Sequence, residues 1–592
     1  MPSTESLVGS RTASSRTFWF RDAIVYQIWP ASFRDSNNDG MGDIQGIIGS
    51  LDYIKSLGVN TIWLSPMYDS PQVDMGYDIS DYESVYPPYG TVADMDELIK
   101  QCHARGLKLI LDLVINHTSD QHAWFKESRS SKTSPKRDWY IWRPAKYDAD
   151  GTRRPPNNWR SNFNQPAWTW DEQTQEYYLH LFCPEQPDVN WTNDDCRHAI
   201  YKSAMEFWLD KGVNGFRVDT VNMYSKPMDF PDAPIVDEGA ETQPAGMLYC
   251  NGPMMHTYLK EMGAILERYD AMTVGELPNT PKTADVVRYV SAAENELSQV
   301  FQFDIVDLGR NPVDFMKNDG YKLPEMKRVV EKWQRFIEGN DAWTTVFIEN
   351  HDQGRSISRF ASDKPEHIAD SGKLLALMNM TLTGTVYVYQ GQEIGMTNVP
   401  ATWSAEEYLD INSINYLASI RKRTNNDAAA MAKALQGVNE LGRDNARTPV
   451  QWSSAPNGGF SSDPTTKPWM RTNDNYTTIN VEAQQNDPAS VLNFYRKIIA
   501  LRKQRASLLG RGQFRLVEEE DEKLFKFIKL AEGGTEKAFV VLNFTEDVQK
   551  YELPDEVKGA QLVVDTKGEQ GGESGALAAF QGRLYLLPAA AQ

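Results

Sequence analysis

The chain has 592 residues, of which 41% are hydrophobic and 11% aromatic, and its formal net charge is -20. This length exceeds one ordinary core and suits a barrel of roughly 250 residues or more with satellite domains. The acidic balance and the lack of a basic arm exclude nucleic acid and anionic lipid as natural partners, so a neutral small-molecule substrate is expected. The 16 Trp residues indicate either a large core or a surface for sugar rings, and composition favours neither.

Nothing in the sequence predicts export or a membrane span. The first 16 residues are polar and rich in Ser and Thr, without an apolar signal region, and no apolar run has membrane-spanning length. The cysteines show neither disulfide-framework nor metal-site spacing, so free thiols are expected at Cys102, Cys183, Cys196 and Cys250. We therefore expect a cytoplasmic protein that acts as a monomer or a weak homo-oligomer.

Short apolar runs that favour strands alternate with helical patterns along the chain. Strand, helix and strand in this order predict βαβ units and a parallel sheet. The rhythm is lost between about residues 118 and 190, a length typical of a functional excursion from a βα loop. The expected strands are 23–28, 61–64, 108–115, 215–218, 272–274, 300–304, 344–348 and 385–389, and the expected helices are 51–57, 94–105, 199–211 and 489–505.

Eight strands are the number that a (β/α)8 barrel needs. From about residue 513 the texture changes to alternating apolar runs and turns, which predicts a small antiparallel β-domain. The predicted fold class is therefore α/β, a (β/α)8 TIM barrel with a loop-rich domain inserted after strand 3 and a C-terminal antiparallel β-domain. The predicted domains are the first part of the barrel (1–117), the inserted domain (118–190), the second part of the barrel (191–512) and a C-terminal β-sandwich (513–592), which ends in a Gly/Ala-rich tail from residue 568.

Two carboxyl groups at predicted strand ends suit bond-breaking chemistry. Arg217 and Asp219 are two residues apart on a strand and face the same way, so the Asp should stay ionised and can act as a nucleophile. A structural ion pair is the alternative. Glu276 follows Gly275, which allows close approach of another group, and a carboxyl facing Asp219 would be held partly protonated, as a general acid requires. A retaining glycosidase uses such a pair.

Two imidazoles also follow predicted strands, each directly after an asparagine. His117 and His351 can hydrogen-bond sugar hydroxyls when neutral, and Asp352 can hold neighbouring hydroxyls. Packing is the alternative for a single histidine. Because barrel chemistry lies at the C-terminal ends of strands, two such pairs favour the binding role.

Residues 35–43 (DSNNDGMGD) resemble the start of a calcium loop. Oxygen ligands alternate along this segment, as a hard cation requires, but Gly46 stands where an EF-hand has its bidentate Glu. A turn without an ion is the alternative. We expect one structural Ca²⁺, with Mg²⁺ as the substitute, held by Asp35, Asn37, Asp39, the Met41 carbonyl and Asp43, and no organic cofactor.

Taken together, the segments DLVINH (112–117), GFRVD (215–219), GE (275–276) and NHD (350–352) resemble glycoside hydrolase family 13, the α-amylase superfamily. The resemblance covers roughly residues 18–550. The phrases AIVYQI (23–28), GYDI (76–79) and GRDNARTP (442–449) are similar to the α-glucosidase and oligo-1,6-glucosidase branch, and to fungal intracellular maltases in particular.

The resemblance implies a role for each site residue. Asp219 would be the nucleophile, Glu276 the acid/base and Asp352 the carboxylate that stabilises the transition state. Arg443, favoured over Arg447, would pair with Asp78 and close the floor of the glucose subsite, which implies exo-cleavage. The residues that would line this subsite are Asp78, His117, Phe182, Arg217, Thr220, His351, Arg443 and Arg447.

The implied activity is a retaining exo-acting α-glucosidase, or maltase, that releases α-glucose from maltose-type oligosaccharides. Thr220 after the nucleophile resembles maltose-preferring enzymes, so α-1,4 linkages are expected. The alternatives are an oligo-1,6-glucosidase (isomaltase) or a sucrose-acting isomerase or transglucosidase on the same barrel. A non-enzymatic transporter heavy chain is disfavoured because all three carboxylates are present.

Overall fold

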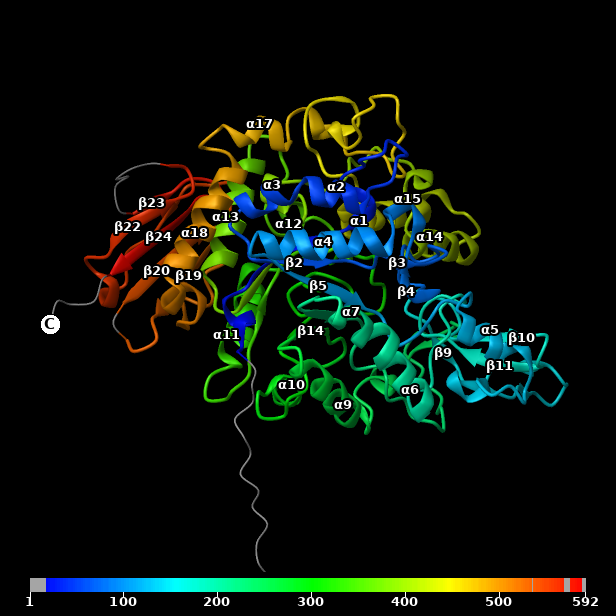
Figure 1. The fold of residues 1–592 in the computed structure, drawn as a ribbon. Helices are drawn as coiled ribbons and strands as arrows, with labels where there is room; N and C mark the ends of the chain where they lie inside the picture. The colour runs from blue at the N-terminus through cyan, green and yellow to red at the C-terminus, as the bar shows by residue number, and fades with distance from the viewer. Residues whose placement is uncertain (1–16, 535, 569–574, 588–592) are drawn as a thin grey trace, which may run out of the picture.

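The computed structural model describes residues 17–534, 536–568 and 575–587, and its centre is a parallel sheet of eight strands (Figure 1). The sheet order is β15-β14-β12-β5-β2-β1-β17-β16. Its two edges are bridged where the Thr345 hydroxyl in β16 donates to the Val300 carbonyl in β15 at 2.9 Å, so the barrel is nearly closed. The predicted fold class is confirmed. The strands are β1 (Ile24–Ile28), β2 (Thr61–Leu64), β5 (Lys108–Leu113), β12 (Gly215–Val218), β14 (Met272–Glu276), β15 (Gln299–Phe301), β16 (Thr345–Val346) and β17 (Thr385–Tyr389).

Helices surround this sheet, and their apolar stripes face it. In α4 (Val92–Ala104) the buried residues Met95, Leu98, Ile99 and Cys102 recur at the spacing of one helical face, and Thr91 caps the first turn. The predicted helix 199–211 is two α-helices, α6 (Asp194–Ile200) and α7 (Phe207–Asp210), joined by a π-helical turn. Other helices of the barrel are α3 (Leu51–Ser56), α9 (Met255–Glu267), α10 (Thr283–Val290), α11 (Leu323–Arg335), α13 (Ile368–Thr381) and α18 (Val491–Gln504).

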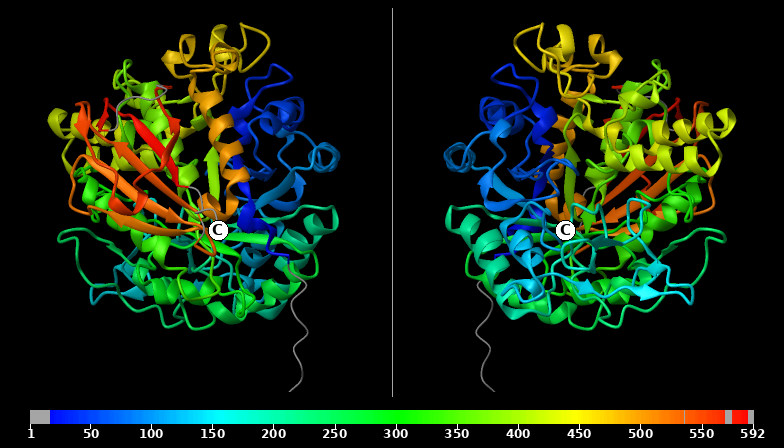
Figure 2. Two further views of the ribbon diagram at one scale, coloured as in Figure 1. Left: turned by 90° about the vertical axis from the view of Figure 1, so that its left-hand side faces the viewer. Right: turned by 90° about the vertical axis from the view of Figure 1, so that its right-hand side faces the viewer.

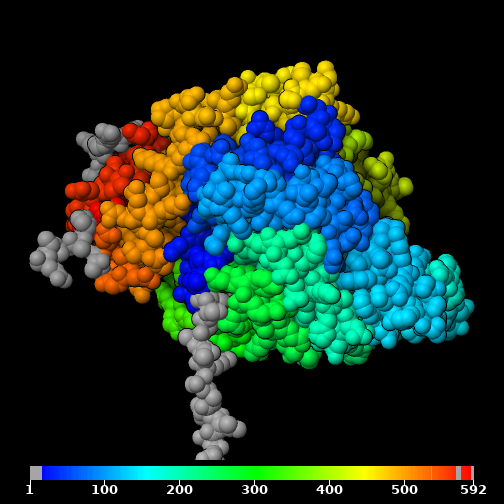
Figure 3. Space-filling view, in the orientation of Figure 1, coloured from blue at the N-terminus to red at the C-terminus, as the bar shows by residue number. Residues whose placement is uncertain are grey.

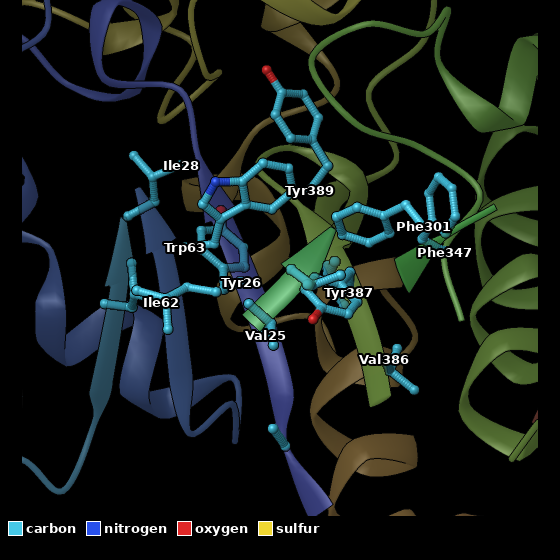
Figure 4. Close-up of a cluster of buried hydrophobic side chains, with 14 of the residues drawn as sticks. Val25, Tyr26, Ile28, Ile62, Trp63, Phe301, Phe347, Val386, Tyr387 and Tyr389 are labelled. Carbon is cyan, nitrogen blue, oxygen red and sulfur yellow. The ribbon is translucent and has the colours of Figure 1, made fainter. Parts of the chain in front are cut away.

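Aromatic rings from distant strands meet inside the barrel (Figure 4). The Phe301 ring stacks on Trp63 of β2, with centroids 5.6 Å apart, and meets the Tyr387 ring edge-on at 4.6 Å. The Phe347 ring also packs against Phe301, with centroids 4.8 Å apart. These large side chains fill the interior and hold strands that are hundreds of residues apart in sequence, which fixes where the strand ends lie.

Two excursions follow strands on one side of the barrel. The segment after β5 contains α5 (Ala123–Ser130) and an antiparallel sheet of β6 (Trp142–Arg143), β10 (Trp168–Asp171) and β11 (Glu176–Leu179), and it protrudes from the body (cyan, Figure 3). A second excursion, between β12 and α9, was not predicted. It pairs with the first through β13 (Gln243–Pro244) and β9 (Trp159–Arg160). The predicted limits of the inserted domain, 118 and 190, stay predictions.

The C-terminal part is an antiparallel β-domain, as expected. Its five-stranded sheet has the order β18-β19-β20-β24-β22 and lies on one side of the molecule (orange to red, Figure 2). Helix α13 packs on β20 and β24 of this sheet and on α18. A two-stranded sheet of β21 and β23 packs beside it through a shared apolar cluster. The strands are β18 (Gln513–Val517), β19 (Leu524–Leu530), β20 (Lys537–Asn543), β21 (Gln549–Lys550), β22 (Gln561–Asp565), β23 (Ala576–Leu577) and β24 (Gly582–Leu587).

A helical hairpin and short connecting elements complete the described chain. The hairpin follows β17 and leads into the one-turn helix α16 (Asp444–Arg447), which matters for the site below. The hairpin helices are α14 (Ile411–Arg423) and α15 (Ala428–Leu441), and the short elements are α1 (Pro30–Phe33), α2 (Ile44–Gly49), α8 (Gly246–Tyr249), α12 (Ser356–Phe360), α17 (Val481–Gln485), β3 (Tyr68–Asp69), β4 (Asp81–Val85), β7 (Lys146–Tyr147) and β8 (Arg153–Arg154).

Two predictions made from composition can be compared with the fold. All four cysteines are free and buried, as predicted. Within the described ranges, no helix combines the length and apolar character needed to cross a bilayer. The polar N-terminal segment, 1–16, lies outside the described residues, as do 569–574 and 588–592 of the predicted Gly/Ala-rich tail.

Candidate active site

The two central carboxyl groups come from neighbouring strands. Arg217 lies in β12, and Asp219 is the first residue after this strand. Glu276 is the last residue of β14, which pairs with β12. A side chain on Gly275 would meet Val221 and Leu297 at 2.8 Å, so glycine allows the close approach expected at this strand end. The backbone register therefore brings both carboxyl groups to the same edge of the sheet.

One guanidinium group joins the two carboxyl groups. Arg217 Nη1 donates to Asp219 Oδ1 at 2.8 Å, and Arg217 Nη2 contacts Glu276 Oε2 at 2.8 Å. Thr220 bridges them again, because its backbone N–H donates to Glu276 Oε2 and its hydroxyl to Asp219 Oδ2, each at 3.2 Å. This residue has a positive φ of 37°, a strained conformation for a β-branched residue. Arg217 and Thr220 therefore hold the two carboxyl groups side by side.

The surroundings of the two acids give them different pKa values. Burial, followed by the like charge of Asp219, raises the pKa of Glu276 to about 8, although Arg217 opposes the rise. Burial also raises the pKa of Asp219 to about 6, and Arg217 and a hydrogen bond from Glu276 limit that rise. Near neutral pH the arrangement therefore holds one proton, which resides on Glu276 while Asp219 is ionised.

The third predicted carboxylate lies beside the pair and is ionised. Asp352 Oδ1 accepts from Arg443 Nη1 at 3.1 Å and from Arg447 Nη2 at 2.9 Å, and Asp352 Oδ2 lies 3.1 Å from His351 Nε2. Burial raises its pKa, but the imidazole and the two arginines outweigh burial and hold the pKa well below its usual range. The side-chain exposures of Asp219, Glu276 and Asp352 are 7%, 13% and 23%, so the three carboxyl groups reach solvent only in part.

The expected pairing of Arg443 with Asp78 is wrong. Arg443 Nη2 contacts Asp74 Oδ1 at 2.9 Å. The Asp78 carboxylate instead accepts from the backbone N–H groups of Val73 and Asp74 and from the Ser70 hydroxyl, at 2.9 to 3.0 Å. Asp78 thus fixes the loop from within, and Asp74 faces the arginine.

Both predicted arginines belong to the cluster. Arg443 and Arg447 contact Asp352, and both also contact the buried Asp410, with Nη to Oδ2 distances of 2.7 Å. Arg447 also lies over the Trp29 ring, 4.4 Å from its centroid. Arg443 was favoured over Arg447 from the sequence, but both arginines contact Asp352.

The two histidines are buried and differ in their partners. The His351 ring is nearly parallel to the Trp29 and Tyr77 rings, with centroids 5.2 and 5.4 Å away, and the Gln27 amide nitrogen lies 2.8 Å from its Nδ1. Burial lowers the pKa of His351 to about 4, so the ring is neutral at neutral pH. His117 Nε2 lies 3.0 Å from the Tyr77 carbonyl, and burial lowers the pKa of this histidine as well.

Aromatic contacts connect the inserted segment to this cluster. The half-buried Phe182 packs against the His117 ring, with centroids 5.0 Å apart, and against Phe163 at 5.6 Å. The Phe163 ring in turn lies under Arg443, 5.1 Å from the guanidinium carbon. The inserted segment thus contacts both sides of the charged network, and Phe182 lies where sequence reasoning expected it, near the predicted subsite residues.

Sequence reasoning missed three carboxylates of the network. Asp112 accepts from Arg217 Nη1 at 2.8 Å, and it lies opposite Arg217 in the register between β5 and β12. Its place as the first residue of the DLVINH segment was the available clue. Asp74, four residues before Asp78, and Asp410, in a segment without strand or helix periodicity, showed no local pattern that marked them.

The loop predicted to bind calcium is organised by hydrogen bonds of its own acids. Asp35 accepts from three backbone N–H groups, those of Asn37, Asn38 and Gly40, and from the Ser461 hydroxyl. Asp43 caps α2 through the Gly46 N–H and also binds Ser36. Among the residues that the structure describes, no group of three or more His, Cys, Asp or Glu is placed to hold a metal ion. The ion stays a prediction.

Comparisons with known proteins agree with this geometry. The alpha-amylase catalytic domain matches residues 27–512. The chain belongs to the α-amylase family of glycoside hydrolases. It is 53% identical over 572 residues to an alpha-glucosidase of Candida albicans, with 96% of this chain and 99% of that protein covered. It is 45% identical over 580 residues to an oligo-1,6-glucosidase of Saccharomyces cerevisiae, with 96% and 98% covered.

Solved structures of the family have the same fold. A mutant isomaltulose synthase of Erwinia rhapontici, in complex with sucrose, matches with a TM-score of 0.89 and 36% identity over 96% of this chain and 99% of that one. A trehalose-6-phosphate hydrolase of Bacillus licheniformis matches with a TM-score of 0.86 and 38% identity, over 96% and 100%. The predicted family and the prediction of a glycoside hydrolase are confirmed, while the catalytic role of each residue stays a prediction.

Proposed function

We propose that this chain is a retaining, exo-acting α-glucosidase that releases α-glucose from the non-reducing ends of maltose-type oligosaccharides. One observation carries the proposal. Asp219 and Glu276 share the Arg217 guanidinium, at 2.8 Å each, while their pKa values are about 6 and about 8. An ionised carboxylate beside a protonated one is the combination that double displacement at a sugar carbon requires.

In the first step, the Asp219 carboxylate attacks the anomeric carbon as Glu276 gives its proton to the departing glycosidic oxygen. The bond to that oxygen breaks, and a β-linked glucosyl ester on Asp219 forms. In the second step, Glu276 takes a proton from water, whose oxygen attacks the same carbon and displaces the ester. Two inversions leave α-glucose and regenerate the starting protonation states.

The surrounding network supports this chemistry electrostatically. Positive charge develops on the sugar ring in the transition state, and the ionised Asp352 would stabilise it. The neutral rings of His117 and His351 would hydrogen-bond sugar hydroxyls, and Phe182 would pack on the ring face. Asp74 replaces Asp78 as the partner of Arg443. This ion pair would close the glucose subsite, so that only the end of a sugar chain enters.

Thr220 supports the preference for α-1,4 linkages, because a hydroxylated residue after the nucleophile resembles maltose-preferring enzymes. An oligo-1,6-glucosidase is the second candidate, since a relative with that name is 45% identical over almost its whole length. A sucrose-acting isomerase or transglucosidase is the third, since isomaltulose synthases share the fold at 36% identity. These activities share the glucosyl intermediate and differ in the acceptor or the linkage.

Two further proposals concern surroundings rather than chemistry. We propose a structural Ca²⁺, or Mg²⁺ in its place, in the loop 35–43, because oxygen ligands alternate there. We also propose a cytoplasmic location, supported by four free thiols, which persist in reducing compartments. A neutral oligosaccharide is the proposed partner, bound by a monomer or a weak homo-oligomer.

The experiment that tests the proposed function is hydrolysis of maltose, isomaltose, sucrose and starch side by side, with all products quantified. We expect glucose from maltose at the highest kcat/KM and little attack on starch. Asp219→Ala should nearly abolish turnover of all four. Isomaltose as the best substrate would favour the oligo-1,6-glucosidase, isomaltulose or trehalulose from sucrose would favour the isomerase, and unchanged activity of Asp219→Ala would end the assignment.

A further inference from the structure

A buried ion pair that the reaction does not use lies directly behind the Asp352 turn. Glu349 follows β16, and its Oε1 accepts from Arg355 Nη1 at 2.7 Å. Glu349 Oε2 accepts from the N–H and hydroxyl of Ser356 at 2.8 and 2.6 Å. Both members of the pair are at most 2% exposed. The pair therefore closes the turn 350–355, which carries Asp352 at its tip, from both ends.

The Arg355 guanidinium also donates to backbone carbonyls of two other segments. Nη1 donates to the Gln390 carbonyl, just past β17, at 2.8 Å. Nε donates to the Asn445 carbonyl at 3.2 Å and Nη2 to the Ala446 carbonyl at 3.3 Å, both in α16. The Arg355 guanidinium carbon lies 5.1 Å from the centroid of the Tyr389 ring, whose hydroxyl donates to the same Ala446 carbonyl at 2.8 Å. One guanidinium thus fixes three backbone segments relative to one another.

The residues bound by Arg355 in α16 stand between the two arginines of the site. Arg443 and Arg447 flank Asn445 and Ala446, and both donate to the same oxygen of Asp352. The turn that presents the carboxylate and the turn that presents its two cations are therefore joined behind the site by Arg355. A shift of either turn by a fraction of an ångström would lengthen both charged contacts at once.

We propose that Arg355 is a positioning residue that holds Arg443 and Arg447 in register with Asp352. It touches no substrate and acts only through these three side chains. The proposal rests on the proposed α-glucosidase activity, in which Asp352 stabilises the transition state. It goes further by assigning the geometry of that carboxylate to a buried arginine that the catalytic steps do not include.

The test is Arg355→Lys, which keeps a cation for Glu349 but loses the planar fork that reaches several carbonyl oxygens. Arg502→Lys is the matched control. Arg502 is buried too, and its guanidinium donates to the Met380, Leu382, Gly384 and Leu509 carbonyls near the start of β17, at the opposite end of the strand from the site. Maltose hydrolysis gives kcat and KM per folded molecule, and thermal unfolding gives Tm.

We expect Arg355→Lys to lower kcat by about tenfold to a hundredfold with a smaller change in KM, since small misplacements near a reacting centre carry such costs. Its affinity for a glucose-configured imino sugar should fall in parallel. Arg502→Lys should lose Tm but keep kcat and that affinity. A Glu349→Gln variant should fall between wild type and Arg355→Lys, because it weakens only one of the Arg355 contacts.

Three results would overturn the proposal. Wild-type kcat and imino-sugar affinity in folded Arg355→Lys would show that the turns hold their positions without the fork. An equal loss of kcat in Arg502→Lys would make the effect a general one of buried arginines. Failure of both Arg355→Lys and Glu349→Gln to fold at the assay temperature would assign the pair to the fold itself. Inactive wild-type enzyme on maltose would instead refute the proposed function on which the inference rests.

Discussion

Replacing Glu276 by glutamine should make the protein more stable while it removes the acid/base catalyst. The folded protein keeps this carboxyl protonated up to about pH 8, whereas the unfolded chain ionises it near 4.5. Between these values the unfolded state binds fewer protons, so stability falls as pH rises through that window and is lowest above it. A glutamine has no proton to lose and escapes this cost.

The size of the effect follows from the two pKa values. With a pKa of 4.5 in the unfolded chain and about 8 in the fold, the ionisation cost is about 1 kcal/mol at pH 5, about 3 kcal/mol at pH 7 and about 5 kcal/mol at pH 9. Glu276→Gln should therefore unfold a few degrees above wild type at pH 7 to 9 and close to wild type at pH 5.

Asp352→Asn gives the control of opposite sign. The folded-state pKa of Asp352 lies well below its usual range, because the imidazole and two arginines outweigh burial. Its ionised form stabilises the fold at every pH above the unfolded value, so Asp352→Asn should lower Tm throughout pH 5 to 9. Thermal unfolding of both variants and wild type at five pH values measures the contrast. A Tm gain of Glu276→Gln that does not grow with pH, or a Tm loss, would refute the reasoning.

Three other predictions follow from the site. The kcat/KM for maltose should rise through about pH 6, where Asp219 ionises, and fall through about pH 8, where Glu276 loses its proton; a flat profile from pH 5 to 9 would contradict the assigned roles. Asp74→Ala should raise KM about tenfold or more, the equivalent of ~1.4 kcal/mol, whereas Asp78→Asn should chiefly lower Tm; the reverse outcome would restore the first pairing. The chelator EDTA, which removes both Ca²⁺ and Mg²⁺, should lower the Tm of wild type but not of Asp39→Ala, and equal wild-type Tm values with and without it would exclude a structural ion in this loop.

The barrel and its central acids were predictable because their patterns are local. Apolar runs of four to six residues mark strands, and in a parallel barrel every strand end lies at the same rim. The positions of Asp219 and Glu276 after such runs were therefore enough to bring them together. The observed strands start or end within three residues of the expected ones, for example Gln299–Phe301 against 300–304.

The partners of the arginines were not predictable in this way. Asp74 and Asp78 are four residues apart in one loop, and which of them faces Arg443 depends on backbone turns with positive φ at Gln72, Met75 and Gly76. Asp410 is the N-cap residue of α14, more than 30 residues before the two arginines, and it meets them only because the α14–α15 hairpin brings α16 back beside it. Such contacts depend on loop conformation and tertiary packing, which periodicity does not report.

The second excursion was missed for a related reason. Residues 219–254 contain many Pro, Asp and Gly residues, and their one strand, β13, is two residues long. It forms only because Trp159 and Arg160 of the inserted segment pair with it, and Arg160 also holds Asp237 at 2.6 Å. A strand of two residues shows no alternation of apolar and polar side chains in the sequence, and its pairing with β9 is what defines it.

The most direct measurement is the anomer of the glucose first released from maltose, followed by ¹H NMR before mutarotation. Double displacement through an ester on Asp219 would give the α-anomer signal first, with the β-anomer growing only at the rate of spontaneous mutarotation. Initial release of β-glucose would mean attack by water in a single displacement, and the carboxyl groups gathered on Arg217 would then need other roles.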